Sequence, residues 1–194
     1  MMEIRGTHGT CVSRAEQIAA QGMTKGPGRV GVGAYFWTAI GDSDSSLAYA
    51  MKLAENWATR ASRGGQYTGE RDPRPAIVHA ALTLEEGDYV SLDDPQLLHW
   101  LRDFLGRRLV QMLGVASVED LDSDRLNRKE DMIHGIIEAF IEQLEDNIGT
   151  PFKVVFKAVP ARGLSDPLLT YIGNPNCFAI RDTNVIRNIE INHL

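Results

Sequence analysis

The sequence predicts a single α+β domain over residues 1–194, and three observations support this fold class. Hydrophobic residues make up 43% of the chain and charged residues 24%, which suits one sizeable core. Segments rich in valine, isoleucine and phenylalanine, typical of strands, occur in both the first and the last part of the chain. Between them, about residues 94–148 carry apolar residues at every third or fourth position, which is typical of helices. Strands from both ends are then expected to close one sheet around a shared core, with a helical insertion between them.

The first part of the chain, up to Leu84, predicts the order strand, helix, strand, helix, strand. The opening strand leads into "RAEQIAAQGM", an amphipathic helix of a turn or two, and then into the glycine-punctuated strand "GVGAYFW". The serines and aspartates of "DSDSS" supply N-cap chemistry for a second helix, which continues to about residue 62. A loop rich in glycine, arginine and proline separates that helix from the strand "AIVHAALTL".

The middle and last parts predict helices followed by strands. "DPQLLHWLRDFLGRRLVQMLG" and "KEDMIHGIIEAFIEQLEDNIG" both show helical spacing and end on glycine. "PFKVVFKAVP" and "NCFAIRDTNVIRNIEI" are typical of strands, and the segment "ARGLSDPLLTYIGNPN" between them predicts a loop.

Charge and cysteine content argue against several classes of protein. The formal net charge of −6 provides no overall basic field for nucleic acid or a membrane surface. The two cysteines, Cys11 and Cys177, show neither a CxxC motif nor a metal-ligand spacing, so no disulfide framework and no metal site are expected. No apolar stretch is long enough to predict a secretory signal or a spanning helix. We therefore expect a cytoplasmic protein with no membrane partner.

Four short motifs follow one another in the first third of the chain: "THGT" at 7–10, an isoleucine and a glycine in "EQIAAQGM", "GVGAYF" at 31–36 and "SLAYA" at 46–50. In this order and spacing they resemble the NAD-binding half of the ADP-ribosyltransferase superfamily, in its diphtheria-toxin and poly(ADP-ribose) polymerase branch. The resemblance covers about residues 4–57 closely and the last strands more weakly. It implies a split sheet with a cleft for NAD, while the helical insertion has no counterpart.

The resemblance also implies roles for individual residues. His8 would hydrogen-bond a ribose hydroxyl, and Gly9 beside it would let the backbone reach the nicotinamide amide. Tyr35 and Tyr49 would sandwich the nicotinamide ring, and Ser46 would donate to its carboxamide oxygen. The implied catalytic residues are His8, Tyr35 and Cys177. The implied NAD-binding residues are His8, Gly9, Thr10, Gly33, Tyr35, Ser46 and Tyr49.

One position departs from the family pattern. The branch carries a glutamate in a context like "NEYxVYD", whereas this chain has "NCFAIRD" at 176–182, with Cys177 in place of the glutamate. A thiol carries no charge at neutral pH unless its pKa is lowered. Three interpretations follow. The chain transfers a single ADP-ribose unit, or it binds NAD without turnover, or it aligns with the family in a different register. Glu70 or Glu130 would then be the substitute for the missing glutamate.

Each assignment has a structural alternative. His8 could be a satisfied core histidine, and His79, His99, His134 and His193 are interpreted as structural or solvated. Gly33 and the following aromatic residues could belong to a packed core, and Ser46 could be a helix cap. The basic residues Arg102, Arg107 and Arg108 are interpreted as a solvated helix face. Arg5 would be the NAD contact in the cholera-toxin branch, but the other motifs of that branch are missing from the sequence.

The function that the resemblance implies is transfer of one ADP-ribosyl unit from NAD to a macromolecular acceptor, with release of nicotinamide. The acceptor would be a protein rather than a nucleic acid, and a toxin, effector or defence factor would fit a domain of this kind. NAD glycohydrolysis, in which water replaces the acceptor, is one alternative, and a non-catalytic module that binds NAD or ADP-ribose is another. The 2′-phosphotransferases of RNA repair share the fold but need phosphate-binding basic residues that the motifs do not identify.

Overall fold

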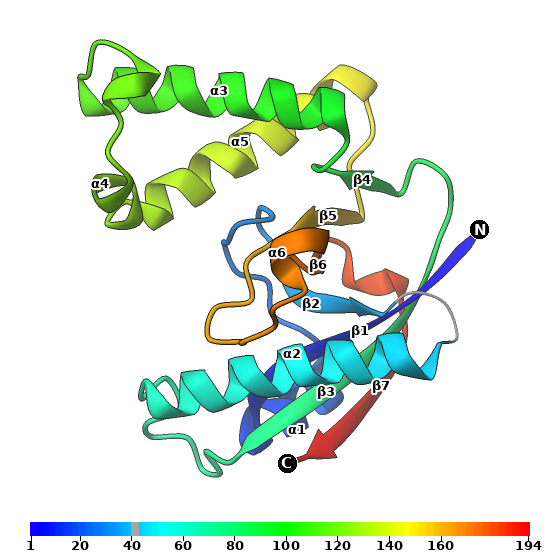
Figure 1. Cartoon of the computed structure of the whole chain (residues 1–194). Helices are drawn as coiled ribbons and strands as arrows, with labels where there is room; N and C mark the ends of the chain where they lie inside the picture. The colour runs from blue at the N-terminus through cyan, green and yellow to red at the C-terminus, as the bar shows by residue number, and fades with distance from the viewer. Residues whose placement is uncertain (40–42) are drawn as a thin grey trace.

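The computed structural model describes residues 1–39 and 43–194 as an α+β fold with one mixed, seven-stranded sheet (Figure 1). The strands are β1 (Met2–Cys11), β2 (Ala34–Ala39), β3 (Pro75–Leu84), β4 (Tyr89–Ser91), β5 (Val154–Ala158), β6 (Asn176–Ile180) and β7 (Ile186–His193). The α-helices are α1 (Val12–Gln21), α2 (Asp44–Arg63), α3 (Pro95–Leu113), α4 (Ser123–Asn127), α5 (Glu130–Ile148) and α6 (Leu169–Ile172). The two short 3₁₀ helices in the described residues are η1 (Val118–Asp120) and η2 (Thr183–Val185).

The strand order in the sheet is β4-β5-β6-β2-β1-β3-β7. Neighbouring strands run antiparallel, except that β4 and β5 are parallel. Parallel neighbours require a long crossover connection, and here that connection is the predicted helical insertion with α3, α4 and α5. Strands from the first and last parts of the chain therefore share one sheet, as the sequence predicts, with β2, β1 and β3 lying between β6 and β7.

The sheet divides into two halves at the pair β1 and β2. β1 pairs with β3 along its whole length, from Met2 to Cys11. In contrast, its pairing with β2 among the described residues covers Arg5–Thr7 against Trp37–Ala39. On the His8 side the pairing ends after Thr7, and we refer to His8–Cys11 with Ala34–Phe36 as the β1–β2 split.

Helices cover both faces of the sheet (Figure 1). α2 crosses β1 and β3, where the Thr7 hydroxyl donates a 2.6 Å hydrogen bond to the Ala50 carbonyl. α1 packs on the other face through Val12 and Ala15. α3 and α5 lie at the β4 end and pack over β5, β6 and β2. The core residues of this second part are Val30, Leu92, Leu101, Ile137, Phe140, Ile141, Phe152, Val155, Val159, Cys177 and Ala179.

The structure confirms the predicted strands and long helices and adds details that the sequence pattern does not reveal. Residues 176–191, predicted as one strand segment, form β6 and β7, separated by η2 where the Asp182 carboxylate accepts from Asn184 N–H. The predicted loop 161–176 contains the single-turn helix α6. None of the helices in 1–39 and 43–194 is long and apolar enough to cross a membrane.

Candidate functional site

His8 is located at the start of the β1–β2 split and connects its two sides. Its Nδ1–H donates a 2.7 Å hydrogen bond to the Tyr35 carbonyl, because a carbonyl oxygen can only accept. The imidazole is half-buried and lies 5.7 Å from the Phe36 ring. Burial lowers the pKa of His8, and the hydrogen bond to Tyr35 opposes this only in part. At neutral pH the ring is therefore uncharged, and Nε2 carries a lone pair that can accept a hydrogen bond.

Tyr35 fixes the loop that enters β2. Its hydroxyl donates to the Gly31 carbonyl and accepts a 3.2 Å hydrogen bond from Val30 N–H. Burial of the hydroxyl raises the pKa of Tyr35. A Cβ on Gly28 would lie 2.4 Å from this hydroxyl, so only glycine fits there. The Tyr35 ring packs with the core under α5, on the opposite face of the sheet from Phe36 and His8.

The other predicted residues of the first motifs are engaged in packing. A Cβ on Gly9 would lie 2.0 Å from the Ala54 carbonyl oxygen, so glycine allows α2 to approach β1 closely. Thr10 is buried and hydrogen-bonds the Tyr67 hydroxyl. Gly33 exchanges two 3.0 Å backbone hydrogen bonds with Gly26 and lies against β6.

Cys177 occupies the first buried position of β6, beside Trp37 of β2. Only 5% of its surface is exposed, and burial raises the pKa of its thiol to about 12. The thiol is therefore neutral at pH 7 and is covered by the core under α5. A thiolate at Cys177, the position that the resemblance implies as catalytic, is incompatible with this environment.

We expect iodoacetamide to leave Cys177 unmodified in the native chain at pH 8. A thiol with a pKa near 12 is less than about 0.1% ionised there, and the thiolate is the reactive form. Cys11, which is fully buried, should behave in the same way. Mass spectrometry should find both thiols modified after unfolding in urea. Rapid modification of Cys177 in the folded chain would contradict the described burial.

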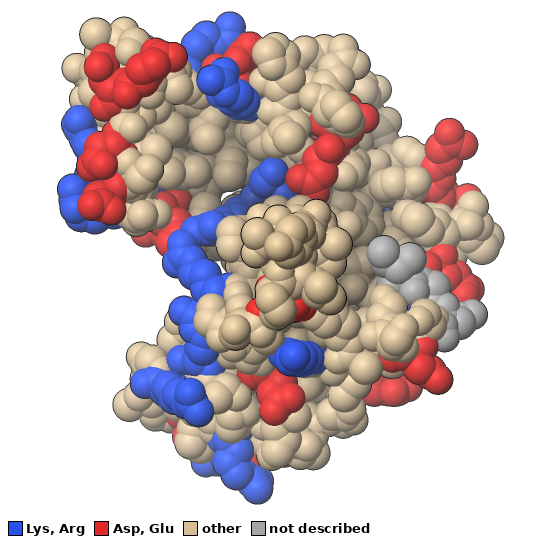
Figure 2. Space-filling view, viewed as in Figure 1, with Lys and Arg blue, Asp and Glu red and all other residues tan. Residues whose placement is uncertain are grey.

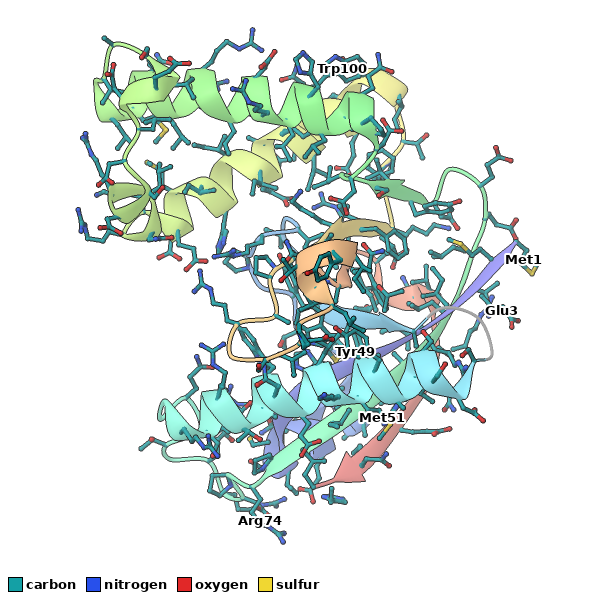
Figure 3. All side chains as sticks on the ribbon, viewed as in Figure 1. Met1, Glu3, Tyr49, Met51, Arg74 and Trp100 are labelled. Carbon is teal, nitrogen blue, oxygen red and sulfur yellow. The ribbon has the colours of Figure 1, made fainter. Side chains whose placement is uncertain are left out.

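Ser46 and Tyr49 lie in the first turns of α2, next to the segment that carries α6. Ser43 is the N-cap residue of α2, and its hydroxyl accepts a 3.4 Å hydrogen bond from Ser46 N–H. Tyr49 projects toward the α6 segment, where its hydroxyl donates a 3.2 Å hydrogen bond to Asp166 (Figure 3). Burial and the neighbouring Asp166 carboxylate raise the pKa of Tyr49. These contacts hold the α6 segment against α2.

The two substitute carboxylates suggested by the sequence lie in different places. Glu70 pairs with Arg14 at 2.6 Å and accepts from the Ser13 hydroxyl, next to α1. Glu130, the first residue of α5, accepts from Arg29 and Arg162.

Two of the histidines that the sequence analysis interpreted as structural or solvated differ in exposure. His99 is exposed on α3, whereas His134 is largely buried beside Glu130. Arg102, Arg107 and Arg108 are exposed on α3, as predicted.

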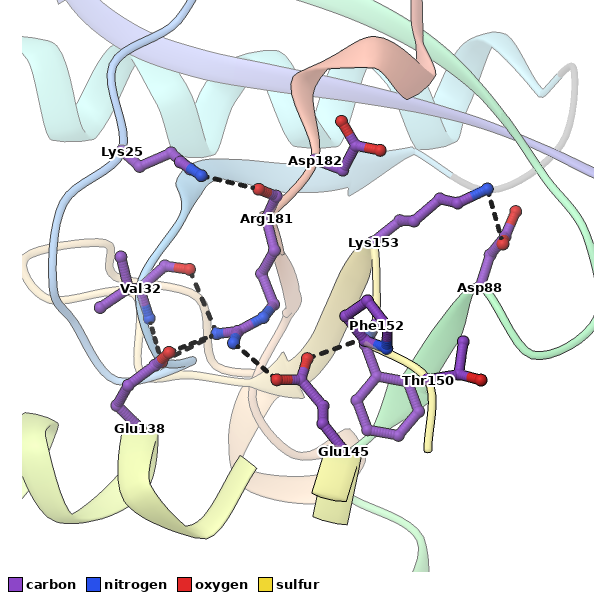
Figure 4. Close-up of a pocket in the computed structure, with 11 residues that line it drawn as sticks. Lys25, Val32, Asp88, Glu138, Glu145, Thr150, Phe152, Lys153, Arg181 and Asp182 are labelled. Carbon is purple, nitrogen blue, oxygen red and sulfur yellow. Dashed lines mark hydrogen bonds and ion pairs between the residues drawn. The ribbon is translucent and has the colours of Figure 1, made fainter. Parts of the chain in front are cut away.

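A charged cluster attaches α5 to the end of β6 (Figure 4). The Arg181 guanidinium pairs with Glu138 at 2.7 Å and with Glu145 at 3.1 Å, and all three side chains are at most 16% exposed. Glu138 also accepts from Val32 N–H and Glu145 from Phe152 N–H. A pocket of about 370 Å³ lies beside this cluster, and none of the predicted site residues lines it.

Sequence reasoning did not single out Arg29, Arg162 and Arg181, and it interpreted His134 as structural or solvated. The partners of the three arginines come from distant parts of the chain, so no local motif could identify them. The neighbour of His134, in contrast, is Glu130, four residues earlier on α5. Among residues 1–39 and 43–194, no group of three or more histidine, cysteine or acidic side chains could hold a metal ion.

Comparison with protein-family models, curated proteins and solved structures found no match to this chain.

Proposed function

We propose that this chain transfers one ADP-ribosyl unit from NAD to a macromolecular acceptor, and that its sheet is the split sheet of the ADP-ribosyltransferase superfamily. The observation that carries the proposal is the arrangement of the motif strands. β6, β2 and β1 are consecutive at the centre of the sheet, and Cys177 pairs with Trp37, which pairs with Thr7. Three segments that resemble the NAD-binding motifs are thus neighbouring strands of the sheet, next to the β1–β2 split.

The proposed reaction needs positioning more than acid or base strength. The bond between the nicotinamide nitrogen and the anomeric carbon of ribose breaks, and its electron pair leaves with nicotinamide. A nucleophilic atom of the acceptor bonds to that carbon and gives up its proton. Because positive charge develops on the ribose, groups that fix its hydroxyls and polarise them contribute to the rate.

His8 is the residue best placed for that role. Its Nδ1–H is committed to the Tyr35 carbonyl, so the tautomer is set and Nε2 is left as the acceptor. An uncharged Nε2 can accept a hydrogen bond from a ribose hydroxyl and draw electron density toward the sugar. Tyr35 acts as a positioning residue, because its hydroxyl holds the 30–31 backbone and its carbonyl orients His8.

A non-catalytic NAD-binding module is the second candidate, and the environment of Cys177 favours it. The position that carries a glutamate in the family holds a neutral, covered thiol here. No carboxylate is therefore supplied from the head of β6 to polarise a ribose hydroxyl. Release of nicotinamide distinguishes transfer from binding alone, and labelling of an acceptor distinguishes transfer from hydrolysis.

We expect the chain to release nicotinamide from NAD, and His8→Ala to lower kcat/KM about ten- to a hundredfold, or about 1.4–2.7 kcal/mol of transition-state stabilisation. The rate should stay level above the ordinary histidine pKa of about 6.5 and fall in acid, once Nε2 is protonated. Chromatography of nicotinamide measures the rate, and His79→Ala, at another half-buried strand histidine, is the matched control.

The acceptor is identified by incubating the chain with labelled NAD and a cell lysate, followed by separate protease and nuclease digestion. Label that protease releases supports a protein acceptor. An unmoved melting temperature at saturating NAD, together with no nicotinamide release, would refute the proposed function, because a ligand that binds the native state raises its stability.

A further inference from the structure

Basic side chains gather in the hollow between the helical insertion and α2 (Figure 2). Two of them, Arg29 and Arg162, come from loops far apart in the sequence and meet at one carboxylate oxygen, Glu130 Oε1. The Arg29 Nε and terminal nitrogens lie 3.0 and 2.5 Å from this oxygen, and an Arg162 nitrogen lies 3.4 Å from it. Two guanidinium groups thus share a single negative charge.

The backbone at each of the two arginines is held in place independently of Glu130. The Arg162 carbonyl accepts hydrogen bonds from Asn56 and Arg60 of α2, so its backbone is fixed. Arg29 precedes Val30 and Gly31, whose backbone Tyr35 holds. The arginines would therefore stay close together if the carboxylate moved away, and two close cations that lose their anion attract another.

His134 adds a third group to the same oxygen. Its Nε2 lies 3.9 Å from Glu130 Oε1, too far for a hydrogen bond, and within the described chain this buried nitrogen has no hydrogen-bond partner. Its side chain is 13% exposed. A buried polar atom without a partner is uncommon and costs free energy. A ligand oxygen placed slightly closer than the carboxylate would satisfy it.

We propose that Arg29 and Arg162 form a binding site for a diphosphate group, and that Glu130 is its internal occupant when no ligand is bound. A diphosphate matches the site better than the carboxylate, because it offers two anionic groups to two guanidiniums, and arginine binds phosphate oxygens in paired geometry. The site lies on the face of the sheet that α2 and α5 cover, opposite the face of His8, so it is a diphosphate site separate from the ribose contact of the proposed function. The insertion then regulates binding of the diphosphate, because α5 must release Glu130 before the diphosphate can enter.

The exposure of the carboxylate is consistent with an exchangeable contact. Glu130 and Arg29 are each 37% exposed and Arg162 is 51% exposed, so each pair contributes little to stability. By comparison, the Glu138 and Glu145 pairs on the same helix are at most 16% exposed. α5 is therefore anchored at its buried pairs, while its first turn is free to change partners.

The test measures binding of inorganic pyrophosphate by titration calorimetry, with Glu130→Gln as the variant and Glu142→Gln, an exposed glutamate on the same helix, as the matched control. We expect Glu130→Gln to lower the Kd for pyrophosphate about five- to tenfold, as removal of a weakly held competitor implies. Glu142→Gln should leave the Kd within about twofold, and added salt should weaken binding in every variant. Adding Arg29→Gln to Glu130→Gln should cancel the gain.

Equal pyrophosphate affinity in the wild type and Glu130→Gln, with melting curves that show both folded, would overturn the inference. So would a gain that survives Arg29→Gln. The same titrations with NAD separate the two proposals. A gain for pyrophosphate without any NAD binding supports the anion site and refutes the proposed function, whereas NAD turnover with unchanged pyrophosphate affinity refutes the internal competitor alone.

Discussion

Replacing Arg181 with alanine is expected to lower the free energy of unfolding by about 3–5 kcal/mol, because removing one partner from a buried ion pair leaves an uncompensated charge. In this chain the loss affects two carboxylates, Glu138 and Glu145, each at most 16% exposed. Both also accept backbone hydrogen bonds, from Val32 and Phe152. The change would therefore loosen α5, the entry to β2 and the start of β5 together. Urea unfolding monitored by circular dichroism measures the effect.

Arg187→Ala, at an exposed arginine on β7, is the control and should change the free energy of unfolding by less than about 0.5 kcal/mol. Combining Arg181→Met with Glu138→Gln and Glu145→Gln should recover part of the loss, since no buried charge then lacks a partner. An Arg181→Ala chain as stable as Arg187→Ala would show that the cluster is solvated in solution.

Replacing Gly9 with alanine should cost about 3 kcal/mol, because overpacking a close contact forces the backbone to move. The added Cβ would lie 2.0 Å from the Ala54 carbonyl oxygen, and α2 must shift to accommodate it. That shift also strains the buried hydrogen bond between Thr7 and the Ala50 carbonyl. The melting temperature should fall by several degrees.

Gly135→Ala on α5 is the matched glycine substitution. A Cβ there meets nothing within 4 Å, and alanine in a helix interior is about 0.5–1 kcal/mol more favourable than glycine. The two alanine variants should therefore change stability in opposite directions. A Gly9→Ala chain with wild-type stability would mean that α2 and β1 are farther apart than described.

Local sequence pattern was sufficient for much of the fold. The β-branched residues of β3 and the spacing along α2 and α5 predict those elements because their apolar faces are continuous in the sequence. Placing "NCFAIRD" in the same sheet as "GAYFW" came from the family resemblance, and the β6–β2 pairing is consistent with it. The β1–β2 split does not follow from the local pattern, since it depends on how far two strands pair and not on the strands themselves, and it was expected only from the family resemblance.

The chemistry of the site was less accessible from sequence. Whether Cys177 carries charge depends on burial under α5, which arises only when the insertion packs on the sheet. Arg29 was not singled out from the sequence for the same reason, because Glu130 reaches it through tertiary packing. His8 was predicted to contact ribose through its ring, but the sequence could not tell which nitrogen is available.

The order of the strands in the sheet also affects when the chain can fold during synthesis. β2 is made well before one of its neighbours, β6, and β3 is made well before β7, the outer strand beside it. Until then β2 and β3 each present an unpaired edge, and pairings between segments so distant in sequence form slowly. The nascent chain therefore cannot complete the sheet on either side of β2, β1 and β3 until residues 176–193 have emerged. The activity that this sheet supports therefore begins only after these strands have been synthesised. Chains whose synthesis stops before β6 and β7 are expected to aggregate and to be inactive.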